Sequence, residues 1–306
     1  MLFIISLISF IAINLAPNSF FASGELNPNI TPEAIEELKA IYGLDKPLYI
    51  QFFSWIYSIL QLDFGISFAS GEKVKEEILS RIPITLTINI VSMILIFIIS
   101  LYFGIKSAMK KNSIFDRFTN QLSLLSFSMP SFYLALVLVL VFSIKFELFP
   151  IAGLHSVPND GSLNYYLDFA WHLTLPIFII VFGGIGSLIL YIRALTIEIL
   201  KSDYIFFARA RGLDNKKILR YYILPNLYPP VITLLGLSLP GIIGGSVILE
   251  TIFSIDGMGL LFYQSALSHD YPVIMGILII GAFLTLIGNM FADLILLKLN
   301  PNYNEK

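Results

Sequence analysis

The chain has 306 residues, of which 57% are hydrophobic and only 13% are charged, and its formal net charge is −2. About a quarter of the residues of an ordinary soluble domain are charged, so this composition argues against that class and favours a membrane protein. The absence of cysteine excludes disulfides, thiolate metal sites and cysteine nucleophiles.

Long apolar runs predict an all-α, polytopic integral membrane protein with six transmembrane helices. A run of about 20 apolar residues can cross the bilayer as a helix. Runs that reach or approach this length without Asp, Glu, Lys or Arg are 84–105, 121–144, 173–192, 231–249 and 273–292. A shorter run, 2–16, is predicted to be a retained helix rather than a cleaved signal peptide, because no basic residue precedes Lys39. The abrupt start of this run favours a true start upstream.

Residues 17–83 predict a helical extracytoplasmic insertion after the first span. Its first helix is expected to be capped by Thr31 and to stop at Gly43. Segment 47–65 is apolar and aromatic but broken by polar residues, which favours a position in the membrane interface. Segment 72–82 has the apolar spacing of a short amphipathic helix.

Prolines mark the predicted spans. Pro130, Pro176 and Pro240 lie within or at the edge of apolar runs. Each removes a backbone hydrogen bond, so each predicts a kink.

The distribution of charge predicts the orientation. Segments 106–120, 193–230 and 293–306 lie on one side of the predicted spans and hold most of the 19 Lys and Arg residues, whereas most of the 21 acids fall on the other side. Because basic residues are enriched in cytoplasmic loops, both termini are expected inside.

The sequence contains no phosphate-binding loop, since Gly is never followed by Lys, and it contains no H-E-x-x-H motif. His155, His172 and His269 all fall in predicted external regions. The sequence favours solvated loop histidines, and a metal site built from the three is the alternative. No predicted span carries an ionisable residue at mid-depth, which argues against proton- or sodium-coupled transport and intramembrane catalysis.

The stretch "ARARGLDNKKILRYYILPN", 208–226, together with residues 203–207 before it, predicts two short cytoplasmic helices joined at a turn, the first of them over 203–211. Gly212 is expected to stop the first helix, Asp214 to cap the second and Pro225 to end it. The apolar stripe of the second helix, which includes Ile218 and Leu219, is expected to need a partner outside the membrane. Lipid is one alternative; a groove on a protein is favoured by the turn.

The spacing from Gly212 to Pro225, with Ala208 before it and "ILP" at the end, resembles the coupling-helix motif of bacterial ATP-binding-cassette (ABC) import permeases. Phe206 and Phe207 stand where that family often has Glu and Ala. "YGLDKPLYIQF", "LDFGISFAS", "SIFDRF", "FSMPSF" and "ETIFSIDGMG" resemble the dipeptide, oligopeptide and nickel branch, in particular its member with a long external loop. "LDFGISFAS" is most similar to nickel permeases.

This resemblance implies the type I ABC importer permease fold and a non-enzymatic role in the bacterial cytoplasmic membrane. It implies a single permease domain, 1–306, with the insertion 17–83 and the coupling segment 203–226. The chain would form half of the path for nickel, as a chelate, or for small peptides. Its implied partners are a second permease, two ATP-binding subunits, an external substrate-binding protein and membrane lipid, with no nucleic acid. ATP and Mg would bind to the partner ATP-binding subunits. This chain would bind no cofactor.

The resemblance also implies two sets of site residues. The coupling residues would be Ala208, Gly212, Asp214, Ile218, Leu219, Leu224 and Pro225. An external gate or binding-protein dock would use Glu250, Asp256, Gly257 and Gly259, and a turn with solvated acids is the alternative for these four. No metal ligands are expected. A stand-alone carrier or channel is the rival functional class, followed by a membrane scaffold.

Overall fold

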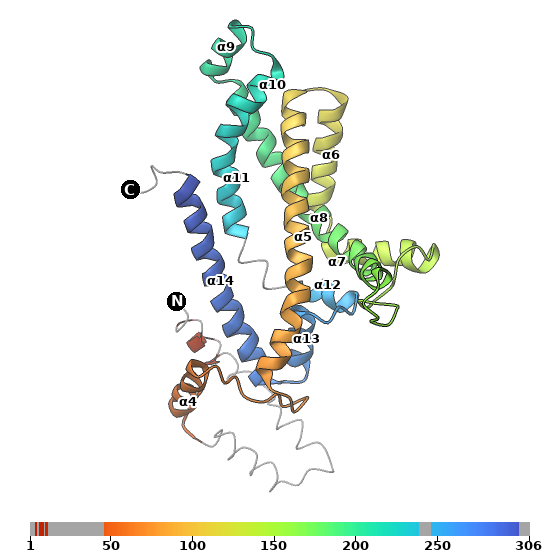
Figure 1. The fold of residues 1–306 in the computed structure, drawn as a ribbon, viewed down its shortest axis with the longest axis vertical. Coiled ribbons are helices and arrows are strands. Elements are labelled where there is room, and N and C mark those ends of the chain that lie inside the picture. The colour runs from red at the N-terminus through yellow and green to blue at the C-terminus, as the bar shows by residue number, and fades with distance from the viewer. Residues whose placement is uncertain (1–3, 5, 9, 12–45, 239–245, 300–306) are drawn as a thin grey trace. The chain divides into compact units, whose positions relative to one another are not determined.

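The structure is a computed structural model that describes residues 4, 6–8, 10–11, 46–238 and 246–299. Within these ranges the chain forms helices, and the one β contact is an isolated bridge between Ile66 and Lys73, so the all-α prediction is confirmed. The segments are α4 (Leu48–Leu60), α5 (Val74–Met109), α6 (Ile114–Ser128), α7 (Ser131–Leu138), η1 (Val139–Lys145), α8 (Leu163–Leu200), α9 (Asp203–Ala210), α10 (Asn215–Ile218), η2 (Leu219–Ile223), α11 (Leu224–Ser238), α12 (Val247–Ile252), α13 (Met258–Leu267) and α14 (Tyr271–Leu299), with η denoting π-helix (Figure 1).

In the described part of the chain, 3 helices are long and apolar enough to cross a membrane, namely α5, α8 and α14. The bent pair 114–128 and 131–145 makes a fourth if it is counted as one span. In a helix the backbone N–H and C=O groups form hydrogen bonds to one another, as a segment that crosses the bilayer requires. The predicted run 2–16 and the predicted helix at 31–43 lie largely or wholly outside the described residues. The run 231–249 is interrupted by the undescribed residues 239–245, which include Pro240.

Proline acts differently at different places in the chain. Around Pro130 the helix breaks, and the two flanking segments meet at 99°. Met129 has an extended backbone (ψ 119°), because the ring of a following proline disfavours helical geometry. Pro83 and Pro176, by contrast, lie inside the continuous helices α5 and α8. The short helix predicted at 72–82 is therefore wrong as a separate element, since its residues form the first turns of α5.

Chain contacts divide the protein into two compact units. The first comprises Met1–Thr85, Gly244–Thr251 and Asp256–Thr285, and the second comprises Leu86–Ile243, Ile252–Ile255 and Leu286–Lys306. In the first unit, Val74 and Ile78 of α5 are fully buried against Met258, Leu261 and Val273. The apolar stripe predicted for 72–82 thus packs inside this unit.

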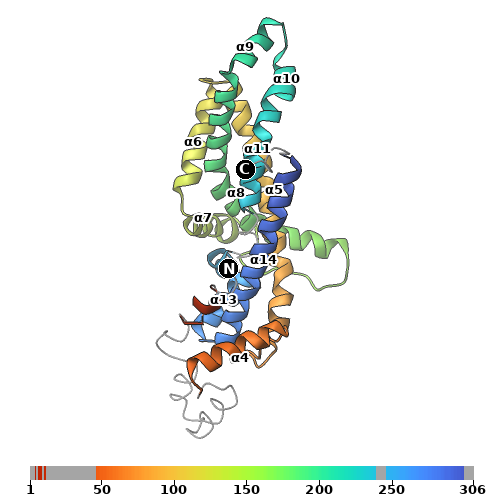
Figure 2. The same ribbon diagram turned by 90° about the vertical axis from the view of Figure 1, so that its left-hand side faces the viewer.

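The second unit is held by two apolar clusters. In one, Val181, Ile185 and Ile189 of α8 are packed by Ile96 and other side chains of α5. The larger cluster joins α5 and α8 to α9, α10, η2 and α11. Figures 1 and 2 both show α9 at one end of this unit, beyond the ends of α5 and α6.

Glycines allow the helices of the second unit to approach closely. A Cβ at Gly104 of α5 would lie 2.8 Å from Ile192, and a Cβ at Gly186 of α8 would lie 2.5 Å from the carbonyl oxygen of Ser123 in α6. A Cβ at Gly183 of α8, by contrast, would meet nothing within 4 Å. Close packing on α8 therefore depends on Gly186 rather than Gly183.

Candidate functional site

The predicted turn at Gly212 is confirmed. The N–H of Gly212 donates to the carbonyl of Arg209 at 2.9 Å, and the N–H of Leu213 donates to the carbonyl of Ala208 at 3.2 Å. This bonding pattern is a Schellman motif, which ends a helix with a left-handed residue. Gly212 has φ +80°, a conformation that residues with a Cβ rarely adopt. The chain therefore reverses between α9 and α10 at a residue suited to the turn.

The cap predicted at Asp214 is confirmed as well. The carboxylate of Asp214 accepts a hydrogen bond from the N–H of Lys217 at 2.9 Å and so begins α10. The predicted end at Pro225 is wrong, because the helix continues through η2 and α11 to Ser238. The wide π-helical turn before Pro225 leaves room for a ring that would clash with the preceding turn of an α-helix.

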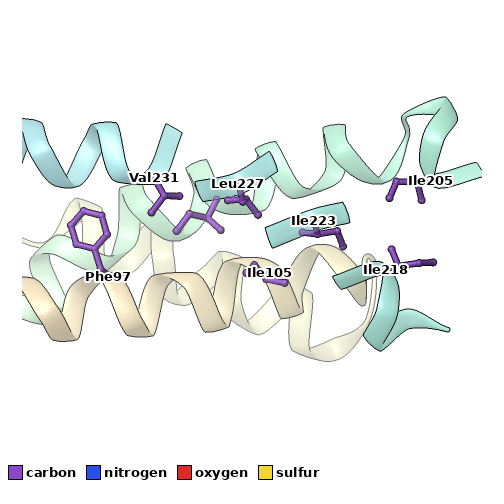
Figure 3. Close-up of a cluster of buried hydrophobic side chains, with 8 residues drawn as sticks. Phe97, Ile105, Ile205, Ile218, Ile223, Leu227 and Val231 are labelled. Atoms are coloured by element: carbon purple, nitrogen blue, oxygen red, sulfur yellow. The ribbon is translucent and has the colours of Figure 1, made fainter. Parts of the chain in front are cut away.

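The apolar stripe of the second helix faces its own chain, which corrects the prediction that it faces a partner. Ile205, Ile218 and Ile223 are each at most 1% exposed. They pack with Ile105 of α5 (Figure 3) and belong to the same cluster as Ile192 of α8. Leu219, Tyr222 and Leu224 lie against this cluster. The stripe therefore anchors the segment to two long helices.

The outward side of the segment is aromatic and basic. Phe206 is 69% exposed, Phe207 is 62% exposed and Tyr221 is 62% exposed. The segment also exposes five basic side chains, namely Arg209, Arg211, Lys216, Lys217 and Arg220. Large apolar side chains gathered on an exposed surface mark interaction sites. We name Phe206, Phe207 and Tyr221 the aromatic face; in the sequence, Phe206 and Phe207 stood out only as departures from the coupling motif.

The structure brings the predicted coupling residues into one segment but gives them different surroundings. Ala208 is 2% exposed and Ile218 is 1% exposed, so both lie in its interior. Gly212, Asp214 and Pro225 lie at its surface. Their roles in coupling stay predictions.

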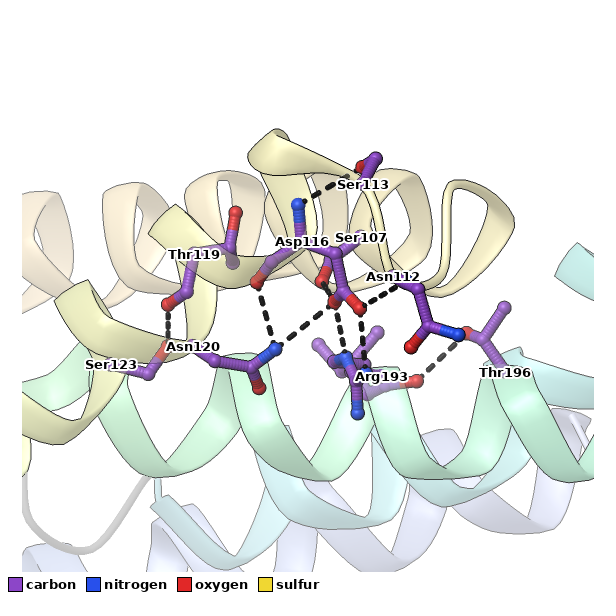
Figure 4. Close-up of polar contacts among 10 residues, drawn as sticks. Ser107, Asn112, Ser113, Asp116, Thr119, Asn120, Ser123, Arg193 and Thr196 are labelled. Carbon is purple, nitrogen blue, oxygen red and sulfur yellow. Dashed lines mark hydrogen bonds and ion pairs between the residues drawn. The ribbon is translucent and has the colours of Figure 1, made fainter.

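An ion pair that the sequence did not reveal joins α6 to α8 in the second unit. Arg193 of α8 donates from Nε to Oδ1 of Asp116 at 2.7 Å and from Nη2 to Oδ2 at 2.9 Å. Asp116 also accepts from the hydroxyl of Ser107 in α5 and from the N–H of Asn112 at 2.8 Å (Figure 4). One carboxylate thus ties three helices together. The motif "SIFDRF" contains Asp116, but nothing in the sequence pointed to a partner 77 residues away.

Glu250, Gly257 and Gly259, predicted for an external gate or dock, do lie together in the first unit. Oε2 of Glu250 accepts from the N–H groups of Gly259 at 2.7 Å and Leu260 at 3.0 Å, and so caps α13. A Cβ at Gly257 would lie 2.5 Å from this carboxylate, and one at Gly259 would lie 2.8 Å from the backbone of Val247.

The fourth predicted residue of that set, Asp256, is separate from the cap of α13. Its carboxylate forms an ion pair with Arg81 at 2.8 Å, and its side chain is 61% exposed. The alternative of a turn with solvated acids therefore describes Asp256 but not Glu250, which is 4% exposed. Whether these residues act as a gate or a dock stays a prediction.

The histidines do not form one site in the described part of the chain. His155 and His172 both lie near Asp168, with Nδ1 to carboxylate distances of 3.7 and 3.5 Å. His269 lies in the other unit. No group of three or more His, Asp or Glu residues that could hold a metal occurs among the described residues.

Comparison with known proteins identifies the family. Residues 100–305 match the model of the inner membrane component of binding-protein-dependent transport systems, and residues 1–89 match the N-terminal model of such membrane components. The chain belongs to this family. It is an inner membrane protein that crosses the membrane several times and serves as a permease subunit of an ABC importer.

Curated relatives extend over nearly the whole permease. The chain is 35% identical over 298 residues to the oligopeptide transport system permease protein AppB of Bacillus subtilis, covering 97% of this chain and 93% of that one. It is 32% identical over 278 residues to the metal-staphylopine import system permease protein CntB of Staphylococcus aureus, covering 91% and 85%. It is 32% identical over 301 residues to the dipeptide permease DppB of Lactococcus lactis, covering 98% and 94%.

A solved structure supports the same fold for this permease. A chain of the inward-facing MetNI methionine ABC transporter matches with a TM-score of 0.58 at 17% identity, covering 73% of this permease and 96% of that chain. The type I ABC importer fold predicted from the resemblance is thereby confirmed, whereas the number of six spans stays a prediction.

Proposed function

We propose that the segment 203–226 docks on an ATP-binding subunit and transmits its ATP-driven movement to the membrane helices. The observation that carries this proposal is the two-sided packing of the segment. Ile205, Ile218 and Ile223 hold its inner side against α5 and α8, and its exposed side chains include the aromatic face and five basic residues. A partner that moves the outer side therefore moves two membrane-crossing helices with it.

The proposed assembly contains this chain, a second related permease, two ATP-binding subunits and an external substrate-binding protein. ATP and Mg bind the ATP-binding subunits, which carry out hydrolysis, and this chain holds no cofactor of its own. The segment 203–226 lies in the cytoplasm, with both chain termini on the same side, since its basic residues follow the positive-inside rule.

The proposed substrate is a small peptide, or nickel bound as a chelate. Relatives named for oligopeptides, dipeptides and metal-staphylopine match this chain at 35%, 32% and 32% identity. These values support the substrate class without separating its members. Uptake of a labelled dipeptide and of radioactive nickel, each supplied to a deletion strain and its complemented counterpart, separates them. Loss of dipeptide uptake alone removes nickel from the proposal.

The coupling role is tested by Gly212→Asp and Gly212→Ala. A Cβ at this position meets nothing within 4 Å, so the effect comes from the left-handed backbone and not from a clash. This strain is about 1–2 kcal/mol. The matched control is Gly161→Ala in an external loop, where φ is +69° and a Cβ also meets nothing within 4 Å.

We expect the Gly212 variants to insert normally but to lose copurification of the ATP-binding subunit and substrate uptake, while Gly161→Ala retains both. Normal docking and uptake in Gly212→Asp would remove the coupling role from the segment. The rival class, a stand-alone carrier or channel, predicts transport by the purified chain in liposomes without any ATP-binding subunit.

A further inference from the structure

A groove lies between α5 and the coupling segment within the second unit. It is open on one side, and its volume is about 500 Å³, within the range of small-molecule sites. Ile105 and Met109 of α5 form one apolar wall, and Leu219 and Leu224 form the other. Lys106 of α5 and Lys110, the residue that follows the end of α5 at Met109, also line it. The groove is therefore apolar inside, with positive charge contributed from the end of one helix.

The two lysines lie four residues apart, and because the N–H of Lys110 donates to the carbonyl of Lys106 at 3.1 Å, both side chains lie on the same side of this helix end. The ammonium group of Lys106 has three hydrogen-bond donors. One of them donates to the hydroxyl of Tyr102 at 2.5 Å. The same ammonium group lies 4.7 Å from the ring centres of Tyr102 and Phe115, which hold it in place. The donors that remain are available to an anion.

The charge of this lysine pair is not neutralised within the described part of the chain. The ion pairs found there place no carboxylate within 4 Å of Lys106 or Lys110. Of the acids close in sequence, Asp116 is engaged by Arg193, and Asp214 caps α10 through Lys217. An anionic occupant of the groove would therefore meet two lysines that no carboxylate of the described residues pairs with.

We propose that this groove binds an anionic phospholipid, with its phosphate between Lys106 and Lys110 and an acyl chain along Ile105, Met109 and Leu219. A phospholipid combines the two chemistries that the groove offers, and α5 crosses the membrane from which the lipid would enter. Basic pockets between membrane helices at the cytoplasmic side bind anionic head groups in this way. Charge complementarity distinguishes this occupant from a zwitterionic lipid.

The lipid would touch α5 on one side and the coupling segment, at Asn215, Leu219 and Leu224, on the other. Resting on the coupling role proposed above, we infer that bound lipid supports transmission by bracing the segment against α5. Anionic lipid content would then set how much uptake results from each ATP hydrolysed. The binding itself does not depend on that role.

Binding is tested with the full-length chain and its copurifying subunits in nanodiscs, without ATP or substrate. A photoactivatable phosphatidylglycerol is expected to label peptides that contain residues 101–110 and 215–224. Unlabelled phosphatidylglycerol should compete and phosphatidylcholine should not. Lys106→Gln/Lys110→Gln should weaken competition roughly thirtyfold, given the attraction of anionic lipid to each lysine.

The matched control is Lys111→Gln/Arg117→Gln, which removes two exposed charges of the same region that do not line the groove. It should leave labelling unchanged. If the double lysine variant does not assemble, Met109→Trp provides the test, because it fills the groove while both charges stay. Equal competition by phosphatidylcholine, equal loss in the control, or cross-linking of these peptides to a neighbouring subunit would each overturn the proposed site.

The effect on coupling is measured separately, as uptake per ATP hydrolysed at increasing phosphatidylglycerol content. It should rise in the wild type and stay constant in Lys106→Gln/Lys110→Gln. If the groove is labelled but uptake per ATP hydrolysed does not change with lipid content, the bracing role is overturned, while the lipid-binding site itself is supported. Loss of coupling in the Gly212 variants with labelling intact would support the coupling role independently.

Discussion

The ion pair of Asp116 and Arg193 leads to the sharpest prediction about stability. Asp116→Asn keeps the shape of the side chain and removes its charge. The Asp116 side chain is 4% exposed and that of Arg193 is 21% exposed, so the variant leaves a guanidinium that water reaches only in part. Breaking a buried pair by removing one partner costs about 3–5 kcal/mol. Because Arg193 keeps some contact with water, we expect a loss near the lower end, about 3 kcal/mol.

The second half of the prediction concerns the double variant Asp116→Asn/Arg193→Gln. It replaces both charges with amides that can bond to one another and leaves no uncompensated ion. We expect it to be less destabilised than the sum of the single variants by about 2 kcal/mol, the coupling typical of contacting residues. The control is Asp203→Asn, an exposed position in the first turn of α9, where a loss below about 1 kcal/mol is expected.

The assay is the free energy of unfolding of the purified protein in mixed micelles under increasing denaturing detergent, with the thermal midpoint as a second readout. Additive losses in the double variant would show that Asp116 and Arg193 act independently and would refute the reasoning. A loss in Asp203→Asn as large as in Asp116→Asn would show that burial of the pair is not the cause.

Three further predictions concern caps and close packing. Gly259→Ala should reduce the yield of folded protein, because the new Cβ would lie 2.8 Å from the backbone of Val247. Gly183→Ala should leave the yield unchanged, because its Cβ would meet nothing within 4 Å. The yield of both variants is measured by detergent extraction and size-exclusion chromatography. Glu250→Ala should lower the thermal midpoint more than Glu250→Gln, which keeps an acceptor for the N–H groups of α13. Asp214→Ala should cost about 1 kcal/mol and Asp214→Asn a few tenths, and equal losses would mean that the cap does not stabilise α10.

Local chemistry explains which features of the coupling segment were predictable. The turn at Gly212 and the cap at Asp214 depend on residues within five positions of each other. A left-handed turn and a cap hydrogen bond therefore leave a direct signature in the sequence. The same reasoning failed at Pro225, because the π-helical turn before it is not encoded by a residue type that pattern reading recognises.

The orientation of the apolar stripe was not predictable. Periodicity indicated that Ile218 and Leu219 share one face of a helix, and that is correct. What covers that face depends on Ile105 and Ile192, which lie 113 and 26 positions before Ile218 in the sequence. The same limit hid the pairing of Asp116 with Arg193 and left the aromatic face unrecognised.

The sequence by itself determined that this protein is helical, that it enters a membrane, and where the coupling segment turns, because apolar length, charge bias and capping act over short stretches of chain. The tertiary structure decided which side of that segment is free for a partner, which charges are neutralised, and which prolines break a helix. Those outcomes depend on contacts between distant residues. At Pro130 the helix bends by 99°, while Pro176 is buried in the unbroken helix α8.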